Sequence, residues 1–170
     1  MQNIEKFHVR FDDFDSTPYY QASPDNRIRI SCDNYNNKNW KHLKNLIYTL
    51  FHEDSETNLT LEVGTIRNNK RIPIKTGIGK FFHITNWKED IVYHSELDMS
   101  FIIATIKNVD ADDIYKYGRR VASGHKDSYI VFYNQTFLMY ISTDVIDIIS
   151  KEKEDIQKVT PFTKELFKKS

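Results

Sequence analysis

The side chains that could bind a metal ion or act as a nucleophile are few and widely separated in this sequence. They are six histidines and one cysteine: His8, His42, His52, His83, His94, His125 and Cys32. No two histidines have the i, i+4 spacing of a helical metal site with a glutamate between them. A zinc site needs three or four converging ligands, so folding would have to assemble one from scattered histidines and aspartates. We therefore expect neither a metal ion nor a cofactor.

Cys32 is the one candidate for nucleophilic catalysis. It ends a predicted strand and is followed by Asp33 and Asn34. A catalytic thiolate needs an activating histidine nearby in space, and the sequence around Cys32 has no familiar catalytic signature. A lone cysteine usually behaves as a small apolar residue, so we interpret Cys32 as structural.

The segment 75–80, Lys-Thr-Gly-Ile-Gly-Lys, has the residue types of a phosphate-binding loop. A P-loop places four residues between its glycines, then a lysine and a hydroxyl residue that open a helix. Here one residue separates Gly77 from Gly79, and the strand-like sequence 81–84 follows. The sequence therefore predicts a turn at this position and no nucleotide site.

Positive charge gathers at two places that could contact a phosphate or an acidic protein surface. The first group surrounds a predicted hairpin and consists of Arg67, Lys70, Arg71, Lys75 and Lys80. The second group lies at the end of a predicted helix and consists of Arg119, Arg120, His125 and Lys126. Basic residues are also ordinary at hairpin tips and at helix C-termini, so a purely solvated role is the competing interpretation.

Aromatic residues are abundant, with 11 Phe, 10 Tyr and 2 Trp. Tyrosines that the core does not absorb are effective interface anchors, particularly beside charged residues. The sequence therefore predicts a partner-binding surface drawn from Tyr19, Tyr20, Arg67, Lys70, Arg71, Lys75, Tyr115, Tyr117, Arg119 and Arg120.

The overall charge is balanced, with 24 Lys and Arg against 24 Asp and Glu. Nucleic-acid binders usually carry a basic excess, because neutralising phosphates supplies most of their affinity, so nucleic acid is a disfavoured partner. The chain contains no signal-peptide core and no run long enough for a membrane helix. Together with the single cysteine, these features predict a cytoplasmic protein that does not associate with membranes.

Hydrophobic periodicity predicts the elements that must position these side chains. Strands are expected at 4–11, 27–32, 58–67, 70–75, 80–84, 99–109, 129–133, 136–141 and 145–149. Helices are expected at 38–51, 110–120 and 151–159, with Asp110 as an N-cap and Pro161 ending the last helix, while 85–98 is left without a firm assignment. This order predicts a single α+β domain over residues 1–170. We expect one mostly antiparallel sheet of about six or seven strands, covered by two or three helices.

The second half of the chain resembles a family of small, uncharacterised bacterial proteins from low-GC, Bacillus-like organisms. The resemblance rests on a hairpin at 128–140, a short strand at 144–149 and a charged helix at 151–159, and it extends over about 27–159. Where that family has a Tyr-Asp-Asp-like turn, this chain has Ile141-Ser142-Thr143-Asp144, so the paired acidic residues are absent. The resemblance implies a bacterial or phage accessory protein of the immunity or toxin-neutralising kind, and it transfers no catalytic residue.

Three hypotheses about function follow. The first is a non-enzymatic binding protein that occludes a protein partner, as an immunity protein or inhibitor does. The second is an enzyme or binder that acts on nucleotides or nucleic acid through a site assembled by folding. A pocket that holds His83, His94 or His125 beside carboxylates or Arg119 would favour it. The third is a self-assembling protein, for which an edge strand buried in a two-fold interface would be the sign.

Overall fold

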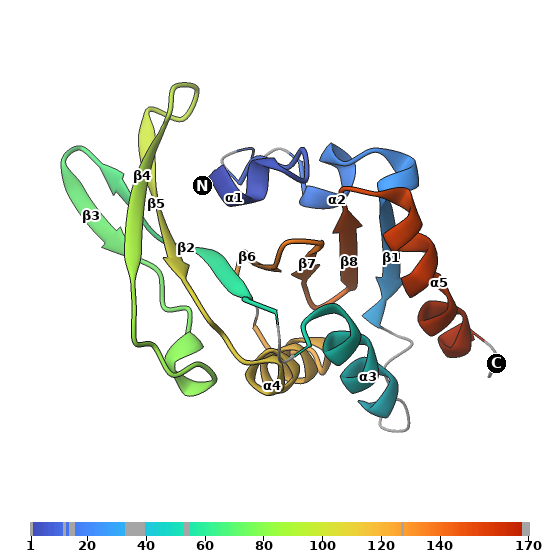
Figure 1. Cartoon of the computed structure of the whole chain (residues 1–170). Helices are drawn as coiled ribbons and strands as arrows, with labels where there is room; N and C mark the ends of the chain where they lie inside the picture. Colours follow the sequence, from blue (N-terminus) through green and yellow to red (C-terminus); the bar gives the residue numbers. More distant parts are fainter. Residues whose placement is uncertain are drawn as a thin grey trace.

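The chain folds around one antiparallel sheet, seen in a computed structural model that describes residues 2–11, 13, 16–32, 40–52, 55–126 and 128–167 (Figure 1). The strands are β1 (Arg27–Ser31), β2 (Asn58–Arg67), β3 (Lys70–Pro73), β4 (Lys88–His94), β5 (Met99–Ile106), β6 (Ile130–Tyr133), β7 (Phe137–Ile141) and β8 (Val145–Ser150). The helices are α1 (Gln2–Glu5), α2 (Pro18–Gln21), α3 (Trp40–Leu50), α4 (Ala111–Ala122) and α5 (Lys153–Phe167), with 3₁₀ turns η1 (Pro24–Asn26) and η3 (Ile78–Lys80). The predicted α+β class and single antiparallel sheet are confirmed, with eight strands in place of six or seven.

The sheet divides into two halves at β2. Its strand order is β1-β8-β7-β6-β2-β5-β4, and β3 also pairs with β2. Residues 58–61 of β2 pair with β6, whereas residues 64–67 pair with β3. We call β3, β4, β5 and residues 64–67 of β2 the wing. Figure 1 shows β3 and the β4–β5 hairpin projecting away from the helices.

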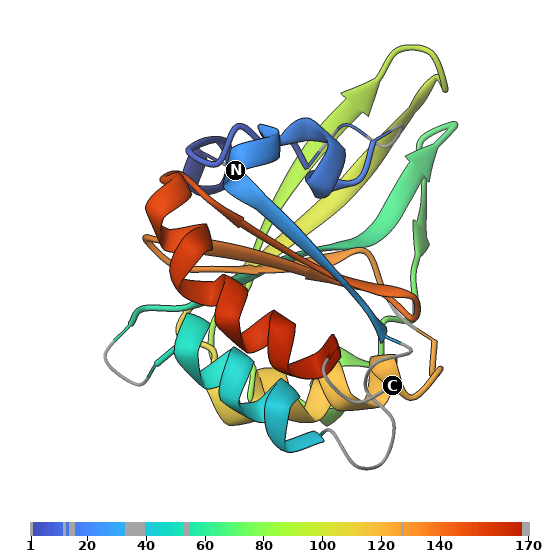
Figure 2. The ribbon, with the colours of Figure 1, turned by 90° about the vertical axis from the view of Figure 1, so that its right-hand side faces the viewer.

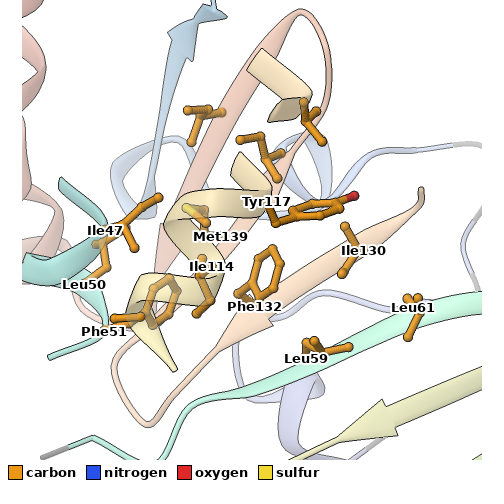
Figure 3. Close-up of a cluster of buried hydrophobic side chains, with 14 of the residues drawn as sticks. Ile47, Leu50, Phe51, Leu59, Leu61, Ile114, Tyr117, Ile130, Phe132 and Met139 are labelled. Carbon is orange, nitrogen blue, oxygen red and sulfur yellow. The ribbon is translucent and has the colours of Figure 1, made fainter. Parts of the chain in front are cut away.

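Both faces of the β6–β8 half are buried. The helices α3, α4 and α5 cover one face, and the N-terminal segment with α1 and α2 covers the other (Figure 2). Strand β6 shows why: Ile130 and Phe132 belong to the helix-side core, while Val131 and Tyr133 belong to the other. Figure 3 shows Ile130 and Phe132 among the helix-side side chains. A strand buried on both faces reads as a continuous apolar run, as this one does.

Two predicted strands are wrong. The segment 4–11 contains α1 and a turn, with His8 at φ +59°. Phe7, Val9 and Phe11 are buried and alternate with exposed residues, but they pack on the sheet without joining it. The segment 80–84 begins with the last residue of η3 and continues as a turn and a loop. The strand that the prediction lacked is β4, in the segment 85–98 that had no firm assignment.

The prediction that Pro161 ends the last helix is also wrong, because α5 continues to Phe167. Pro161 is exposed, so the carbonyl that loses its backbone partner can bind water. The hydroxyls of Thr160 and Thr163 donate to the carbonyls of Ile156 and Thr160, which adds bonds on either side of the proline.

The predicted cap of α4 is confirmed, since the Asp110 carboxylate accepts from the Asp112 backbone N–H at 2.7 Å. For the helix expected at 38–51, the sequence offers Asn36 or Asn37 as the N-cap, and both lie outside the described residues. Among those residues, no helix has both the length and the apolar character needed to cross a bilayer.

The junction between the wing and the rest of the sheet depends on Gly64. A Cβ at this position would come within 2.8 Å of the Ile72 carbonyl oxygen on β3. We expect Gly64→Ala to lower the free energy of unfolding by about 2 kcal/mol, because backbone must move to relieve the overlap. Gly79→Ala is the matched control, since a Cβ there meets nothing within 4 Å. Urea denaturation measures both, and equal stability of the two variants would show that the junction is not tightly packed.

Candidate binding surfaces

The predicted partner-binding residues do not form one surface. Tyr19 and Tyr20 lie on α2, which packs on one face of the sheet, and the others lie elsewhere. Arg67, Lys70, Arg71 and Lys75 lie around the β2–β3 hairpin, and Tyr115, Tyr117, Arg119 and Arg120 lie on α4, on the opposite face.

Tyr19 holds α2 on the sheet. The guanidinium carbons of Arg27 and Arg29, both on β1, each lie 4.2 Å from the centre of its ring. Arg29 also forms a bidentate ion pair with Asp147 on β8, with N–O distances of 2.6 and 2.8 Å. Tyr20 is 63% exposed, and its hydroxyl accepts from Arg29 at 3.1 Å. Of this pair, only Tyr20 presents a large free surface.

Asp147 is a buried carboxylate at the centre of this arrangement. It lies directly opposite Arg29 in the register of β1 and β8, and its side chain is fully buried. Burial raises the pKa of the Asp147 carboxyl above its ordinary value, while the hydrogen bonds and charge of Arg29 oppose that rise. The ion pair therefore connects the edge strand β1 to the sheet interior.

The interpretation of Tyr117 as an interface anchor is wrong, because its side chain is only 3% exposed. Its ring contacts Phe81, Phe82 and Phe132 at centroid distances of 5.6, 5.9 and 5.8 Å. Ile114, Tyr117, Gly118 and Val121 form the buried stripe of α4 at i, i+3, i+4 and i+7. Tyr115 is half-buried at the edge of the same core, and Arg119 and Arg120 are exposed.

Exposed apolar side chains concentrate on the wing and its flanking turns. Among the described residues, seven large apolar side chains are exposed, and Tyr20 alone lies elsewhere. The other six are Ile72, Ile74, Trp87, Ile91, Tyr93 and Leu97. Scattered exposed apolar residues are normal, but their concentration on one projecting part of a sheet is not.

Three of these side chains share the helix side of the wing. Ile91 pairs with Ile102, whose side chain belongs to the helix-side core, and residues opposite each other in a sheet point to the same face. Tyr93 has the same parity along β4 as Ile91, so it points the same way. Trp87 lies one residue before β4, and its indole N–H donates to Glu89, which pairs with Ala104 of the helix-side core. We call Trp87, Ile91 and Tyr93 the β4 patch; they are 43%, 64% and 63% exposed. Ile72 lies on the opposite face, in the row of Thr65 and Phe101.

An ion pair joins β3 and β4 on the helix side of the wing. Arg71 on β3 donates two hydrogen bonds to Glu89 on β4, at 3.0 and 2.7 Å, although β2 and β5 separate the two strands. The wing must therefore curl toward its helix side. The Trp87 indole N–H also donates to Glu89, at 3.0 Å. The hydrogen bonds from Arg71 and Trp87 lower the pKa of the Glu89 carboxyl, so this contact weakens as the pH falls through that lowered value.

Folding also brings parts of the two basic groups together. Lys80, Phe81, Arg120, His125 and Lys126 line a hollow of about 220 Å³ between the segment after β3 and the end of α4. An adjoining hollow of about 200 Å³ shares Phe81, Arg120 and His125 and adds Arg119. We call the two together the basic hollow. It places His125 beside Arg119, which is the arrangement that favours the second hypothesis about function.

The potential metal ligands stay apart. No group of three or more His, Cys, Asp or Glu side chains in the described part of the chain is arranged to hold a metal ion. Cys32 is buried, and its thiol donates to the Ser142 carbonyl at 3.4 Å. Neither observation adds a catalytic centre.

The β4 patch is the feature that sequence reasoning missed. Its signal was the alternation of Trp87, Glu89, Ile91 and Tyr93 with Lys88, Asp90, Val92 and His94. Charged residues on both faces obscured the pattern, which is typical of an edge strand exposed to solvent.

Comparison of the chain with protein-family models, curated proteins and solved structures found no match.

Proposed function

We propose that this chain is a protein-binding module whose β4 edge and β4 patch dock an extended segment of a protein partner. The observation that carries the proposal is the concentration of exposed apolar side chains on one projecting part of the sheet. Tryptophan and tyrosine are the residue types most enriched among the anchors of protein interfaces. The module has no need of a catalytic centre, and it would act by covering a site on its partner, as inhibitors and immunity proteins do.

The position of β4 supports an extended occupant. It is the last strand of the sheet, so one of its edges has no strand neighbour among the described residues. An edge strand presents backbone N–H and C=O groups that can pair with a strand from another chain. Side chains at alternate positions of the added strand would then pack on Trp87, Ile91 and Tyr93.

Charge near the patch indicates the chemistry of the partner segment. Arg67 and Lys70 at the neighbouring hairpin tip are exposed and have no ion pair within the described residues. Lys88 on β4 is 76% exposed and lies 3.7 Å from Asp90. We therefore expect apolar side chains at alternate positions of the partner strand, flanked by carboxylates.

Ile91→Glu tests the proposal, with Ile72→Glu as a matched control on the opposite face of the wing. Tagged wild-type and variant chains are used to capture protein from the native host, with and without nuclease. The affinity for any stoichiometric partner is then measured with both proteins purified. We expect Ile91→Glu to weaken binding about 30-fold or more, because it puts a charge at the centre of the apolar contact. Ile72→Glu should retain binding.

Two results would contradict this function. One is a partner that binds both variants equally, and the other is a wild-type chain that retains no stoichiometric protein once nucleic acid is digested. Light scattering of the purified chain tests whether the occupant is a second copy of the chain. A dimer that Ile91→Glu dissociates would identify a second copy as the occupant and would favour self-assembly over a separate partner. Because both side chains are exposed, we expect both variants to fold, and thermal melts check this.

A further inference from the structure

The end of α4 has a backbone geometry that turns two basic side chains back toward the helix. Gly124 has φ +84°, its N–H donates to the Val121 carbonyl at 2.9 Å, and the His125 N–H donates to the Arg120 carbonyl at 3.3 Å. These two bonds define a Schellman motif, which needs a residue that tolerates positive φ. The motif brings His125 and Lys126 beside Arg120 in the basic hollow.

The opposite wall comes from a distant part of the sequence. Gly77 has φ +68°, and the 3₁₀ turn η3 that follows it ends at Lys80. Lys80 and Phe81 thereby reach the same hollow as Arg120. Cations in the last turn of α4 are favourable for the helix dipole alone, but that effect does not account for a lysine contributed by another segment.

Four basic side chains of the hollow have no counter-charge within the described residues. The side chains of Lys80, Arg120, His125 and Lys126 make no hydrogen bond or ion pair with the described residues, and no carboxylate appears among the described lining residues. Lys116, which lines the adjoining part of the hollow, is the exception, because it is paired with Asp112 at 2.8 Å. Unpaired like charges that converge on one concavity repel each other and concentrate anions there.

An aromatic ring completes the hollow. Phe81 is half-buried and fixed edge-to-face against Tyr117, with 5.6 Å between the ring centres. A fixed ring at the boundary of a pocket offers a surface for the flat part of a ligand. Arginine and lysine nearby would bind its phosphates through charge-assisted hydrogen bonds. We propose that the basic hollow is a binding site for a nucleoside phosphate, separate from the β4 patch.

A larger hollow at the start of α4 lacks this concentration of basic side chains. It measures about 480 Å³ and is lined by His52, Glu56 and Asp110 among others. Its acidic groups would repel phosphate. The size of a hollow therefore does not single out the anion site, whereas the sign of its charges does.

To test this, ATP or sodium pyrophosphate is titrated into the purified chain at fixed ionic strength, and binding is measured by calorimetry and NMR. We expect ATP to bind more tightly than pyrophosphate. Arg120→Gln should weaken ATP binding about tenfold, as expected for loss of a charge-assisted contact, and His125→Gln should weaken it by a smaller factor. Phe81→Leu should weaken ATP binding while leaving pyrophosphate binding unchanged. Lys107→Gln, which removes an exposed cation near the opposite end of α4, and Ile91→Glu should both leave ATP binding unchanged.

Several outcomes would overturn the proposal. They are no ATP binding at millimolar concentration, pyrophosphate binding as tight as that of ATP, or equal losses in Arg120→Gln and Lys107→Gln. Tighter binding of a single-stranded oligonucleotide than of ATP would replace the small ligand with nucleic acid. Because Arg120 is exposed, circular dichroism is expected to show a folded variant, which separates lost binding from lost structure.

Discussion

Replacing Arg29 by methionine is expected to lower the free energy of unfolding by about 3 kcal/mol at pH 7. The Asp147 side chain is fully buried while that of Arg29 is 26% exposed, so the substitution leaves a carboxylate in the sheet without its counter-charge. Breaking such a pair costs far more than the pair contributes by itself, because the remaining charge cannot recover its water. Chemical denaturation of both proteins measures the difference.

The sign of the pH dependence gives a second test of the same variant. Burial already raises the pKa of Asp147, and removing Arg29 removes the opposing effect. A carboxyl with a raised pKa in the folded state costs stability once it ionises, so stability falls as the pH rises through that pKa. The deficit of Arg29→Met relative to the wild type should therefore be largest at neutral pH and shrink on acidification.

The control for this prediction is an exposed pair with the same geometry. Arg71 and Glu89 also form a bidentate pair, but the Arg71 side chain is 55% exposed. Arg71→Met should change stability much less than Arg29→Met, because water can solvate Glu89 after the loss. If the two variants were equally stable, burial of Asp147 would not be the cause. The double variant Arg29→Met/Asp147→Asn should recover part of the loss, since it removes the buried charge.

Tyr117→Ala is expected to lower the free energy of unfolding by about 4 kcal/mol. The ring is buried between α4 and the sheet, against Phe82 and Phe132, and its removal leaves a cavity that these rigid neighbours cannot fill. Tyr117→Phe keeps the ring and loses the hydroxyl that accepts from the Ser128 N–H at 3.3 Å, so it should cost only about 1 kcal/mol. Urea denaturation distinguishes the two variants.

The same pair of variants separates a core role from a binding role. A Tyr117→Ala chain with wild-type stability and weakened binding to a protein partner would restore Tyr117 as an interface anchor. Loss of stability with unchanged partner binding in Tyr117→Phe would agree with the structure. Loss of Tyr20, which is 63% exposed and whose hydroxyl bonds to Arg29, should lower stability much less than loss of Tyr117.

The two proposed surfaces depend on different physical features and can be tested independently. The β4 patch depends on apolar area at a strand edge, and the basic hollow depends on uncompensated charge. Salt should therefore weaken nucleotide binding in the hollow strongly and protein binding at β4 only slightly. If the chain performs both, a bound nucleotide and a bound protein would occupy separate parts of it.

Local pattern determined most of the secondary structure. The alternation at 58–67 corresponds to β2, the Asp110 cap corresponds to the start of α4, and the apolar run at 99–109 contains β5, which has a neighbouring strand on each side. These signals lie within a few residues of one another, so they act before any tertiary contact forms. Sequence reasoning could have gone further with Tyr117, since Ile114, Tyr117 and Val121 already show the helical period of a buried stripe.

Tertiary structure alone decided the remaining features. The alternation of Phe7, Val9 and Phe11 suits a strand, yet this segment became a cover for the sheet, because strand formation requires a partner edge that no local pattern specifies. Pairing of β4 with β5 and curling of the wing decided that Trp87, Ile91 and Tyr93 face solvent. The basic hollow likewise required Lys80 and Arg120 to meet across the fold. Periodicity reports which side of an element is apolar, whereas exposure and the convergence of charge depend on which other elements pack there.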